Sequence, residues 1–250
     1  MMEIIMYLRD YFGFMIAIIG CLILSGLASG RVKSVFRKYD SVKCRSRLSG
    51  YDTAMRLLQM NGARDISVGS VRGFLTDHYD PTKALVNLSE ATYGSYSIAA
   101  IAVAAHEIGH VMQKRDGYAL YRFRAMIVPV VNFGTYLAMP LVLIGLLLDR
   151  FALTADTNTG YYIAMIGVIL YGSALLFALV TLPVEWNASK RAKEMLLSEG
   201  ILSSDELPVA KEVLSAAAMT YLASLLTALV LFLRFLIQVL TLFGRRDYKR

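Results

Sequence analysis

Cysteine and histidine are both scarce in this sequence, and each scarcity narrows what the chain can be. Only two cysteines occur in 250 residues, Cys21 inside an apolar run and Cys44 in a basic stretch. Two cysteines are too few for a disulfide framework, and their spacing is not that of a zinc finger. Two of the three histidines stand four residues apart, so their spacing carries information.

Charge is missing from several long stretches of the chain. The sequence is 56% hydrophobic, with a mean hydropathy of +0.52, and is therefore too apolar for an ordinary soluble domain despite its net charge of +7. Stretches of this length can cross a bilayer as helices, so we predict a mainly α, multi-span transmembrane protein. The apolar blocks are residues 12–29, 125–148, 161–184 and 213–243.

Seven basic residues follow the first apolar block, between Arg31 and Arg47. The positive-inside rule places this segment in the cytoplasm. A cleaved signal peptide is the competing interpretation, but its basic residues would precede the apolar run. Nucleic-acid binding is another, but beside a membrane span attraction to anionic lipid is the simpler account. We therefore expect the lipid bilayer, and no nucleic acid, as a partner.

Two arguments disagree about the side of the membrane on which the C-terminus lies, after the last apolar block. It is interrupted by Arg234 and Gln238, yet it is long enough to cross. Counting spans from a cytoplasmic basic segment puts the C-terminus outside, whereas the basic residues between Arg245 and Arg250 favour the inside. We favour a crossing because of the length of the block.

His106, Glu107 and His110 match the H-E-x-x-H pattern of zinc hydrolases. Residues four apart share one helix face, so both imidazoles can reach one Zn²⁺ ion. Glu107 is placed to act as general base on a water held by the metal. We predict a helix from about Ser95 to Lys114, and Gly109 within it suggests a close contact or a chance glycine. The alternative is a buried helix with two hydrogen-bonded histidines.

Catalytic zinc normally takes three protein ligands, so a third must be found. The blocks at 125–148 and 161–184, joined by a polar link at 149–160, predict a transmembrane hairpin whose first arm is kinked at Pro129 and Pro140. Two crossings return the chain to the side it left. Residues after the hairpin therefore lie on the same side of the membrane as the two histidines.

Three glutamates on that side are possible third ligands. Pro183 suits the first turn of a new helix, which would aim Glu185 at the membrane surface. Glu194 and Glu199 stay open as alternatives, but they lie among basic residues in a pattern typical of a solvated face. We choose Glu185.

The segment before the motif predicts smaller elements. Residues Ser49 to Asn61 form an amphipathic helical pattern. Val71–Thr76 and Ala84–Leu88 predict a hairpin around a turn-rich segment. A strand just before the helix that carries His106 and His110 could present an edge to an extended peptide, or the hairpin could be purely structural. His78 lies in the turn, where a histidine is more often exposed or hydrogen-bonded than a ligand.

With these residues in view, the chain resembles the membrane-bound neutral zinc metallopeptidases of the YugP-like type, which are distant relatives of the HtpX and Ste24 proteases. The resemblance covers most of the chain from Leu48 onward. It is carried by separated segments in the same order: Leu48–Gly50, Leu75–Pro81, Ala104–His110, Leu182–Glu185 with Ala188 and Ser189, and Ala216–Tyr221.

The resemblance implies a small α+β, zincin-like catalytic part of the gluzincin type. It implies a Zn²⁺ cofactor bound by His106, His110 and Glu185, with Glu107 as the catalytic base. It also implies an endopeptidase whose substrates are peptides or membrane proteins.

One position departs from the related proteases. In the HtpX-like relatives an aspartate four residues after the ligand glutamate supports the site, and here that position is Ser189. A ligand histidine normally needs such a partner, so Asn187, Ser189 or a backbone carbonyl must fill that role. Tyr221 could stabilise an oxyanion, but a tyrosine in a helix more often packs, and we leave it out of the site.

We therefore expect a multi-pass protein of the cell membrane whose active site faces the cytoplasm. The expected parts are an N-terminal transmembrane anchor at 1–30, a catalytic part at 31–125, a transmembrane hairpin at 126–184, a third-ligand helix at 185–212, and a C-terminal apolar helix with a basic tail at 213–250.

Two other functions compete with this one. An intramembrane metalloprotease would cut within the lipid phase, but the apolar run before His106 is short, and no Asp-Gly or Asn-Pro-Asp ligand motif lies in a later span. A non-catalytic membrane scaffold of the same fold would have no use for the intact Glu107.

Overall fold

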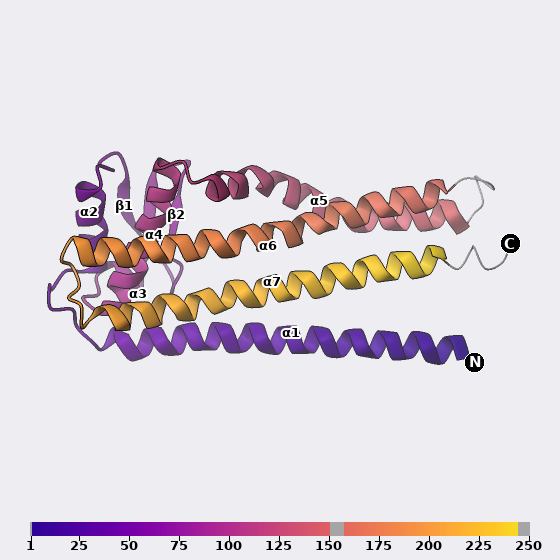
Figure 1. The fold of residues 1–250 in the computed structure, drawn as a ribbon, viewed down its shortest axis with the longest axis horizontal. Helices are drawn as coiled ribbons and strands as arrows, with labels where there is room; N and C mark the ends of the chain where they lie inside the picture. The colour runs from indigo at the N-terminus through magenta and orange to yellow at the C-terminus, as the bar shows by residue number, and fades with distance from the viewer. Residues whose placement is uncertain (1, 151–157, 245–250) are drawn as a thin grey trace. The chain divides into compact units, whose positions relative to one another are not determined.

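Four long helices dominate the computed structural model, which describes residues 2–150 and 158–244 (Figure 1). They are α1 (Met2–Asp40), α5 (Ala119–Arg150), α6 (Thr159–Ser198) and α7 (Leu207–Gly244). Each contains one of the predicted apolar blocks and is long and apolar enough to cross a membrane. The predicted mainly α class with a small α+β part is confirmed.

The short elements all lie between α1 and α5 along the chain. The helices are α2 (Gly50–Met60), α3 (Glu90–Tyr93) and α4 (Ile98–Arg115). The strands are β1 (Ser67–Val71), β2 (His78–Asp80) and β3 (Leu85–Ser89). The described residues divide into two compact units, one within 1–25, 123–181 and 222–250, and the other made of 26–122 and 182–221. The second unit holds all six short elements, and we call it the α4 unit.

In the first unit, α5 and α6 pack through glycines. A Cβ atom added to Gly145 would lie 2.4 Å from the carbonyl oxygen of Gly160, and one added to Gly167 would lie 2.6 Å from that of Ala138. Glycine allows two backbones to approach this closely, as in packed membrane helices. The two predicted arms are therefore paired directly, while most of the predicted polar link, residues 151–157, falls outside the described residues.

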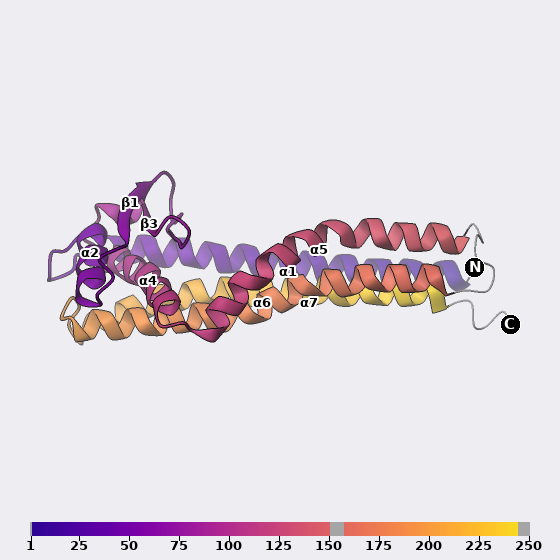
Figure 2. The ribbon, with the colours of Figure 1, turned by 90° about the horizontal axis from the view of Figure 1, so that it is seen from above.

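The structure agrees with the predicted kinks at Pro129 and Pro140 but not with a helix start at Pro183. Pro129 and Pro140 lie inside α5, which bends along its course (Figure 2), as expected of a helix with internal prolines. Pro183, by contrast, does not begin a helix, because α6 runs without a break from Thr159 to Ser198. Proline removes one backbone hydrogen bond, and long apolar helices tolerate that loss where neighbouring groups satisfy the freed carbonyl. The predicted new helix is thus the second half of α6.

Helix α4 is the centre of the α4 unit. Its sequence alternates isoleucine and valine with alanine, and 13 of its 18 residues are buried. A helix that is apolar on nearly all sides is stable only when covered by other elements. Here the cover includes α2, the sheet and parts of the long helices. The largest fully buried side chains of this core are Phe36, Leu57, Leu58, Leu88, Ile98, Ile101, Ile108, Leu196, Ile201 and Leu202.

Helix α2 agrees closely with the sequence prediction. Ser49 is its N-cap: the Ser49 hydroxyl accepts from the Asp52 amide, and the Asp52 carboxylate accepts from the Ser49 amide at 3.0 Å. This reciprocal capping box satisfies two amides at the start of the helix. The helix ends at Met60, and Gly62 follows in the left-handed conformation at φ +70°.

The sheet differs from the predicted hairpin. Its strand order is β1-β3-β2, with β1 parallel and β2 antiparallel to the central β3. The hairpin partner of β3 is therefore not Val71–Thr76 but His78–Asp80, which lies inside the predicted turn. The strand β3, which was predicted to offer an edge to a peptide, is not an edge strand, because it is paired on both sides. An extended peptide could add only to β1 or β2.

A buried carboxylate fastens the turn between α6 and α7 to the segment after α1. Glu206 accepts hydrogen bonds from the Arg45 amide at 2.9 Å, from the Ser203 amide at 3.0 Å and from the Ser203 hydroxyl at 2.8 Å. Burial acts to raise the pKa of Glu206, but these hydrogen bonds outweigh it, so the pKa lies below its usual value.

Replacing Glu206 by glutamine is expected to lower the free energy of unfolding by about 1–2 kcal/mol at neutral pH, because an NH₂ group would then face an N–H donor. A lowered folded-state pKa stabilises the fold above the unfolded-state pKa of about 4.3, and that gain is lost as the pH falls through the folded-state pKa. Thermal unfolding in detergent should therefore show a difference between wild type and Glu206→Gln that shrinks in acid. Glu90→Gln, which makes the same change at an exposed position of α3, is the control and should change little; an equal effect there would contradict the assignment.

Candidate metal centre

Helix α4 brings His106 and His110 together on one face. The helix begins at Ile98, three residues later than predicted, because the Ser97 hydroxyl accepts from the Ala100 amide and caps it. The spacing of four residues then stacks the two rings one turn apart, with centroids 4.8 Å apart and planes nearly perpendicular. Both Nε2 atoms face the same point.

Glu185 reaches that point from α6. Its Oε2 atom lies 3.2 Å from His106 Nε2 and 3.3 Å from His110 Nε2, and the Glu185 carboxylate is buried. The two helices approach closely here, since a Cβ on Gly109 would lie only 2.5 Å from the carbonyl oxygen of Ala188. The close contact suggested by Gly109 is therefore real, and it sets the distance between the histidines and Glu185.

The donor atoms of His106, His110 and Glu185 fit a zinc ion. Two imidazole nitrogens and one carboxylate oxygen are the ligand types of catalytic zinc sites. Ligands at about 2.0–2.1 Å around a tetrahedral ion are separated by about 3.4 Å, close to the two distances observed here. The three ligand atoms all lie within 4.8 Å of one another.

Gln113 determines which ring nitrogen of His110 carries the proton and which has the lone pair. The Gln113 Nε2 group donates to the carbonyl oxygen of Val184 at 2.7 Å and to Asn187 Oδ1 at 3.0 Å. Its Oε1 atom must therefore accept from His110 Nδ1, which lies 2.9 Å away. With the proton on Nδ1, the Nε2 lone pair of His110 points toward Glu185. This is the arrangement that a metal-binding histidine requires.

Ser189 supports the other histidine. Its hydroxyl oxygen lies 3.1 Å from His106 Nδ1, so Ser189 is the side chain that contacts the second ring nitrogen of His106. Asn187, the other side chain considered for this role, instead accepts from Gln113. Gln113 itself is a partner that the sequence analysis did not identify. The signal was present, because residue 113 lies three positions after His110 on the same helix face.

An exposed ion pair continues this network to the end of α4. The Arg191 guanidinium donates to Asn187 Oδ1 at 2.9 Å and to the carboxylate of Asp116, the residue that caps the C-terminus of α4. Arg191 therefore joins α4 and α6 at the solvent-exposed edge of their contact. It helps to hold the two halves of the metal centre in register.

Glu107 lies beside the metal-binding face and is buried. Burial raises the pKa of Glu107 above its usual value, and the nearby imidazoles of His106 and His110 lower it by less. A carboxylate with a raised pKa holds an accepted proton more firmly, as a general base near neutral pH requires.

The other acidic and histidine candidates lie elsewhere. Glu194 is exposed and pairs with Lys190 one helical turn away, and Glu199 follows the end of α6. His78 is exposed in β2, where its ring nitrogens contact the Thr76 carbonyl oxygen and the Asn87 side chain. Within the described residues, the His/Cys/Asp/Glu cluster at this centre contains none of the three.

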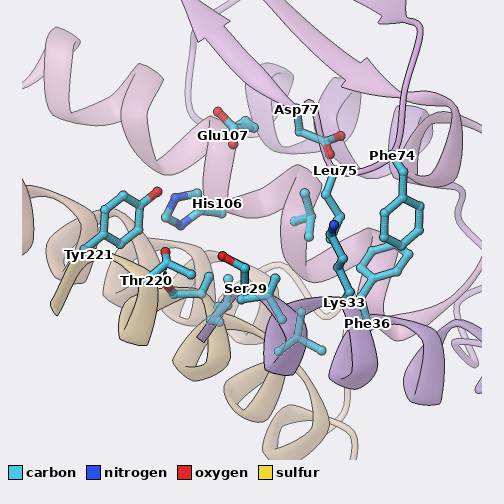
Figure 3. Close-up of a pocket in the computed structure, with 15 residues that line it drawn as sticks. Ser29, Lys33, Phe36, Phe74, Leu75, Asp77, His106, Glu107, Thr220 and Tyr221 are labelled. Carbon is cyan, nitrogen blue, oxygen red and sulfur yellow. Dashed lines mark hydrogen bonds between the residues drawn. The ribbon is translucent and has the colours of Figure 1, made fainter. Parts of the chain in front are cut away.

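A cavity of about 310 Å³ opens next to the metal centre, and Glu107 and His106 form part of its wall (Figure 3). Tyr221 and Thr220 of α7 line the cavity on the same side as His106, and Asp77 lines it near Glu107 (Figure 3). The cavity gives a second molecule access to the Glu107 carboxylate. The centre therefore combines a cluster of three residues that could hold a metal ion, an adjacent buried carboxylate and an open approach.

Comparison with known proteins agrees with this chemistry. The chain matches the family described as "Putative neutral zinc metallopeptidase" over residues 14–240. It is 45% identical over 222 residues to the "Putative membrane protease YugP" of Bacillus subtilis (strain 168), an alignment that covers 89% of this chain and 94% of that protein. No solved structure matches the chain. The family match begins inside the first apolar block, and thus before Leu48, where the resemblance in the sequence began. With nearly the whole length matched, the chain belongs to the neutral zinc metallopeptidase family.

Proposed function

We propose that this protein is a zinc-dependent endopeptidase, embedded in the membrane, that hydrolyses peptide bonds of peptides or membrane proteins at the cytoplasmic membrane face. The observation that carries the proposal is the convergence of His106 Nε2, His110 Nε2 and Glu185 Oε2 beside the buried Glu107. Family membership supports the peptidase activity and the zinc requirement. The similarity to a membrane protease, together with four long apolar helices, supports the location in a membrane.

His106, His110 and Glu185 would hold the zinc ion as a gluzincin-type ligand set. When bound, zinc supplies a Lewis acid that polarises the peptide carbonyl and makes a nearby water more acidic. Ser189 and Gln113 keep the two imidazole rings in orientation through their Nδ1 atoms. The protein therefore presents three fixed donors and needs no rearrangement of α4 to bind the ion.

Glu107 is the residue to which we assign the proton transfers. Its carboxylate takes a proton from the attacking water and later gives that proton to the nitrogen of the departing amine. Both transfers use the same buried oxygen atoms, which face the cavity where the peptide would lie (Figure 3). Burial also limits access of bulk water to this carboxylate, which favours transfer to the leaving group.

The arrangement of the chain supports a multi-pass protein. The α4 unit consists of two segments, 26–122 and 182–221. Along the chain, the paired arms of α5 and α6 lie between them. If each arm crosses the membrane, the two segments emerge on the same side, as their common fold requires. The basic segment from Arg31 to Arg47 belongs to this unit and favours the cytoplasmic side.

Removing the third ligand should empty the metal site. In detergent-purified protein, elemental analysis is expected to find about one zinc per chain in the wild type, while Glu185→Ala should bind zinc at least about 100-fold more weakly. Glu194→Ala removes an exposed glutamate from the same helix and should retain the metal. Stoichiometric zinc in Glu185→Ala would contradict this ligand set, and a folded wild type that binds no zinc would contradict the proposed function.

Gln113→Leu should weaken zinc binding by about 10- to 100-fold without removing a ligand, because His110 loses the acceptor that orients its ring. The measurement is competition for zinc against a chelating dye at several dye concentrations. Gln59→Leu makes the same chemical change at an exposed position of α2 and serves as the control. Equal zinc affinity of the two variants would show that Gln113 only packs.

A further inference from the structure

The cavity beside Glu107 has mostly apolar walls. Helix α1, the loop before β2, α4 and α7 all contribute to it. Its apolar lining residues are Val32, Phe36, Phe74, Leu75, Val103, Val213, Leu214 and Ala217. A volume of about 310 Å³ lies at the lower end of the range for ligand pockets. The space is therefore suited to an apolar side chain of a bound peptide.

The loop above the cavity is held in place by its own contacts. The ring of Phe74 packs edge-on against Phe36 of α1, with centroids 5.4 Å apart, and the Arg37 guanidinium lies over Phe74 at 5.5 Å. The next residue, Leu75, has φ +56°, a conformation that residues with side chains rarely adopt. Strained backbone of this kind persists only where surrounding contacts hold it, and it occurs often at binding sites. Here it accompanies a leucine that lines the cavity.

Opposite the loop, α1 and α7 are held together by polar contacts. The hydroxyl of Tyr39 donates to the carboxylate of Glu212, and the Lys38 ammonium lies 3.5 Å from the same carboxylate. These contacts fix the separation of the two helices close to the cavity-lining residues Phe36 and Val213. The cavity is therefore bounded on both sides by anchored elements.

Lys33 is a cation in the lining of the cavity, and it extends from α1 toward the loop that carries Leu75 and Asp77 (Figure 3). The Asp77 carboxylate, which lines the same cavity, accepts from the Ser89 amide at 2.7 Å and from the Ser89 hydroxyl at 2.9 Å, so each of its oxygens is held by the end of β3. No hydrogen bond or ion pair to Lys33 is found among residues 12–149 and 158–243. The Lys33 ammonium is therefore available to an acidic group that enters the cavity.

We propose that this cavity is a substrate subsite that takes an apolar side chain and that Lys33 pairs with a carboxylate of the same substrate. This inference rests on the proposed peptidase function and names the substrate class: peptides in which an apolar residue stands close to an acidic side chain or to a free C-terminal carboxylate. The apolar walls supply affinity through burial, and Lys33 supplies selection by charge.

The test uses quenched fluorescent peptides that each contain a single leucine. One set carries Glu, Gln or Lys at one to four positions from the leucine, with an amidated C-terminus, and a second set carries Gln with a free C-terminal carboxylate. Cleavage is followed with the zinc-loaded full-length enzyme, and binding of labelled peptides is followed by fluorescence anisotropy with full-length Glu107→Gln protein. Because binding does not depend on turnover, it tests the subsite even if cleavage fails.

An exposed ion pair changes affinity by about two- to fivefold, so the wild type should prefer a Glu peptide over its Gln counterpart by about that factor. Lys33→Gln should abolish the preference, and Lys33→Glu should reverse it in favour of the Lys peptide. Arg31→Gln removes the same charge from the same helix outside the cavity and should keep the wild-type preference. The preference is a ratio measured on one preparation, so a partly unfolded variant cannot imitate the change.

The apolar part of the subsite has its own test. Ala217→Leu narrows the cavity and should shift the preference from peptides with phenylalanine to peptides with alanine by about tenfold or more. A response only to the free-carboxylate set would identify the C-terminal carboxylate as the group bound, and a response only to the Glu set would identify an acidic side chain. Cleavage or binding that is independent of both charge and side-chain size would overturn the proposal. Charge-selective binding without any cleavage by the wild type would instead overturn the peptidase function and leave the subsite in place.

Discussion

Glu107→Gln is expected to reduce peptide cleavage by about 10²- to 10⁴-fold, the contribution that a positioned general base typically makes. Glutamine has nearly the same shape as glutamate but cannot take a proton from water. Because Glu107 does not contribute an atom to the cluster of three ligand residues, the variant should bind zinc as the wild type does. The measurement is the rate of cleavage of a quenched peptide pool, with zinc content determined on the same sample.

The matched control is Glu90→Gln, which makes the same change at an exposed position in α3. It should leave both the rate and the zinc content unchanged. If Glu107→Gln protein with full zinc cleaved peptides as fast as the wild type, the assignment of the base would be wrong. If it lost zinc as well, Glu107 would be needed to build the metal centre.

Gly109→Ala is expected to disable the metal centre although alanine is the better helix former by about 1 kcal/mol. The added methyl carbon would lie 2.5 Å from the carbonyl oxygen of Ala188. The two atoms belong to α4 and α6, which carry the histidines and Glu185. Either α4 or α6 must shift, and the shift separates His106 and His110 from Glu185. A displacement of about 1 Å in such a site can cost about 10²-fold in rate.

Zinc affinity and peptide cleavage should therefore both fall in Gly109→Ala, while circular dichroism shows helix content preserved. Gly30→Ala is the control, because a Cβ at Gly30 of α1 would meet no atom within 4 Å. Normal zinc affinity in Gly109→Ala would mean that the two helices can separate without disturbing the ligands. In that case the close approach of α4 and α6 would not explain why a glycine stands within the motif.

Sequence patterns were most reliable where the structure depends on local geometry. The two histidines share a helix face because the α-helix repeats every 3.6 residues, whatever surrounds it. The start of α2 at Ser49 was also predictable, since its capping box is made by residues three positions apart. The apolar blocks became long helices because backbone groups in an apolar environment must bond within their own segment.

Predictions that depended on a local signal alone were wrong where packing decided the outcome. Pro183 is a typical residue for a helix start, but α6 continues through it. The segment from Asp77 to Pro81 has the composition of a turn, yet it contains β2, because the backbone of His78–Asp80 pairs with β3. For β2, the neighbouring strand β3 supplied the backbone hydrogen bonds that the local sequence did not predict.

By itself, the sequence determined the H-E-x-x-H spacing and the apolar spans, and it led to Glu185 through the predicted hairpin, a choice that the resemblance to a known family supported. Only the tertiary structure decided how Glu185 meets residues 75 to 79 positions earlier in the chain, and which side chains hold the two histidines. Ser189 and Gln113 take that role because Gly109 allows α4 and α6 to approach within contact of their backbones. Distances between helices depend on side chains that are remote in sequence, and no periodicity within one helix encodes them.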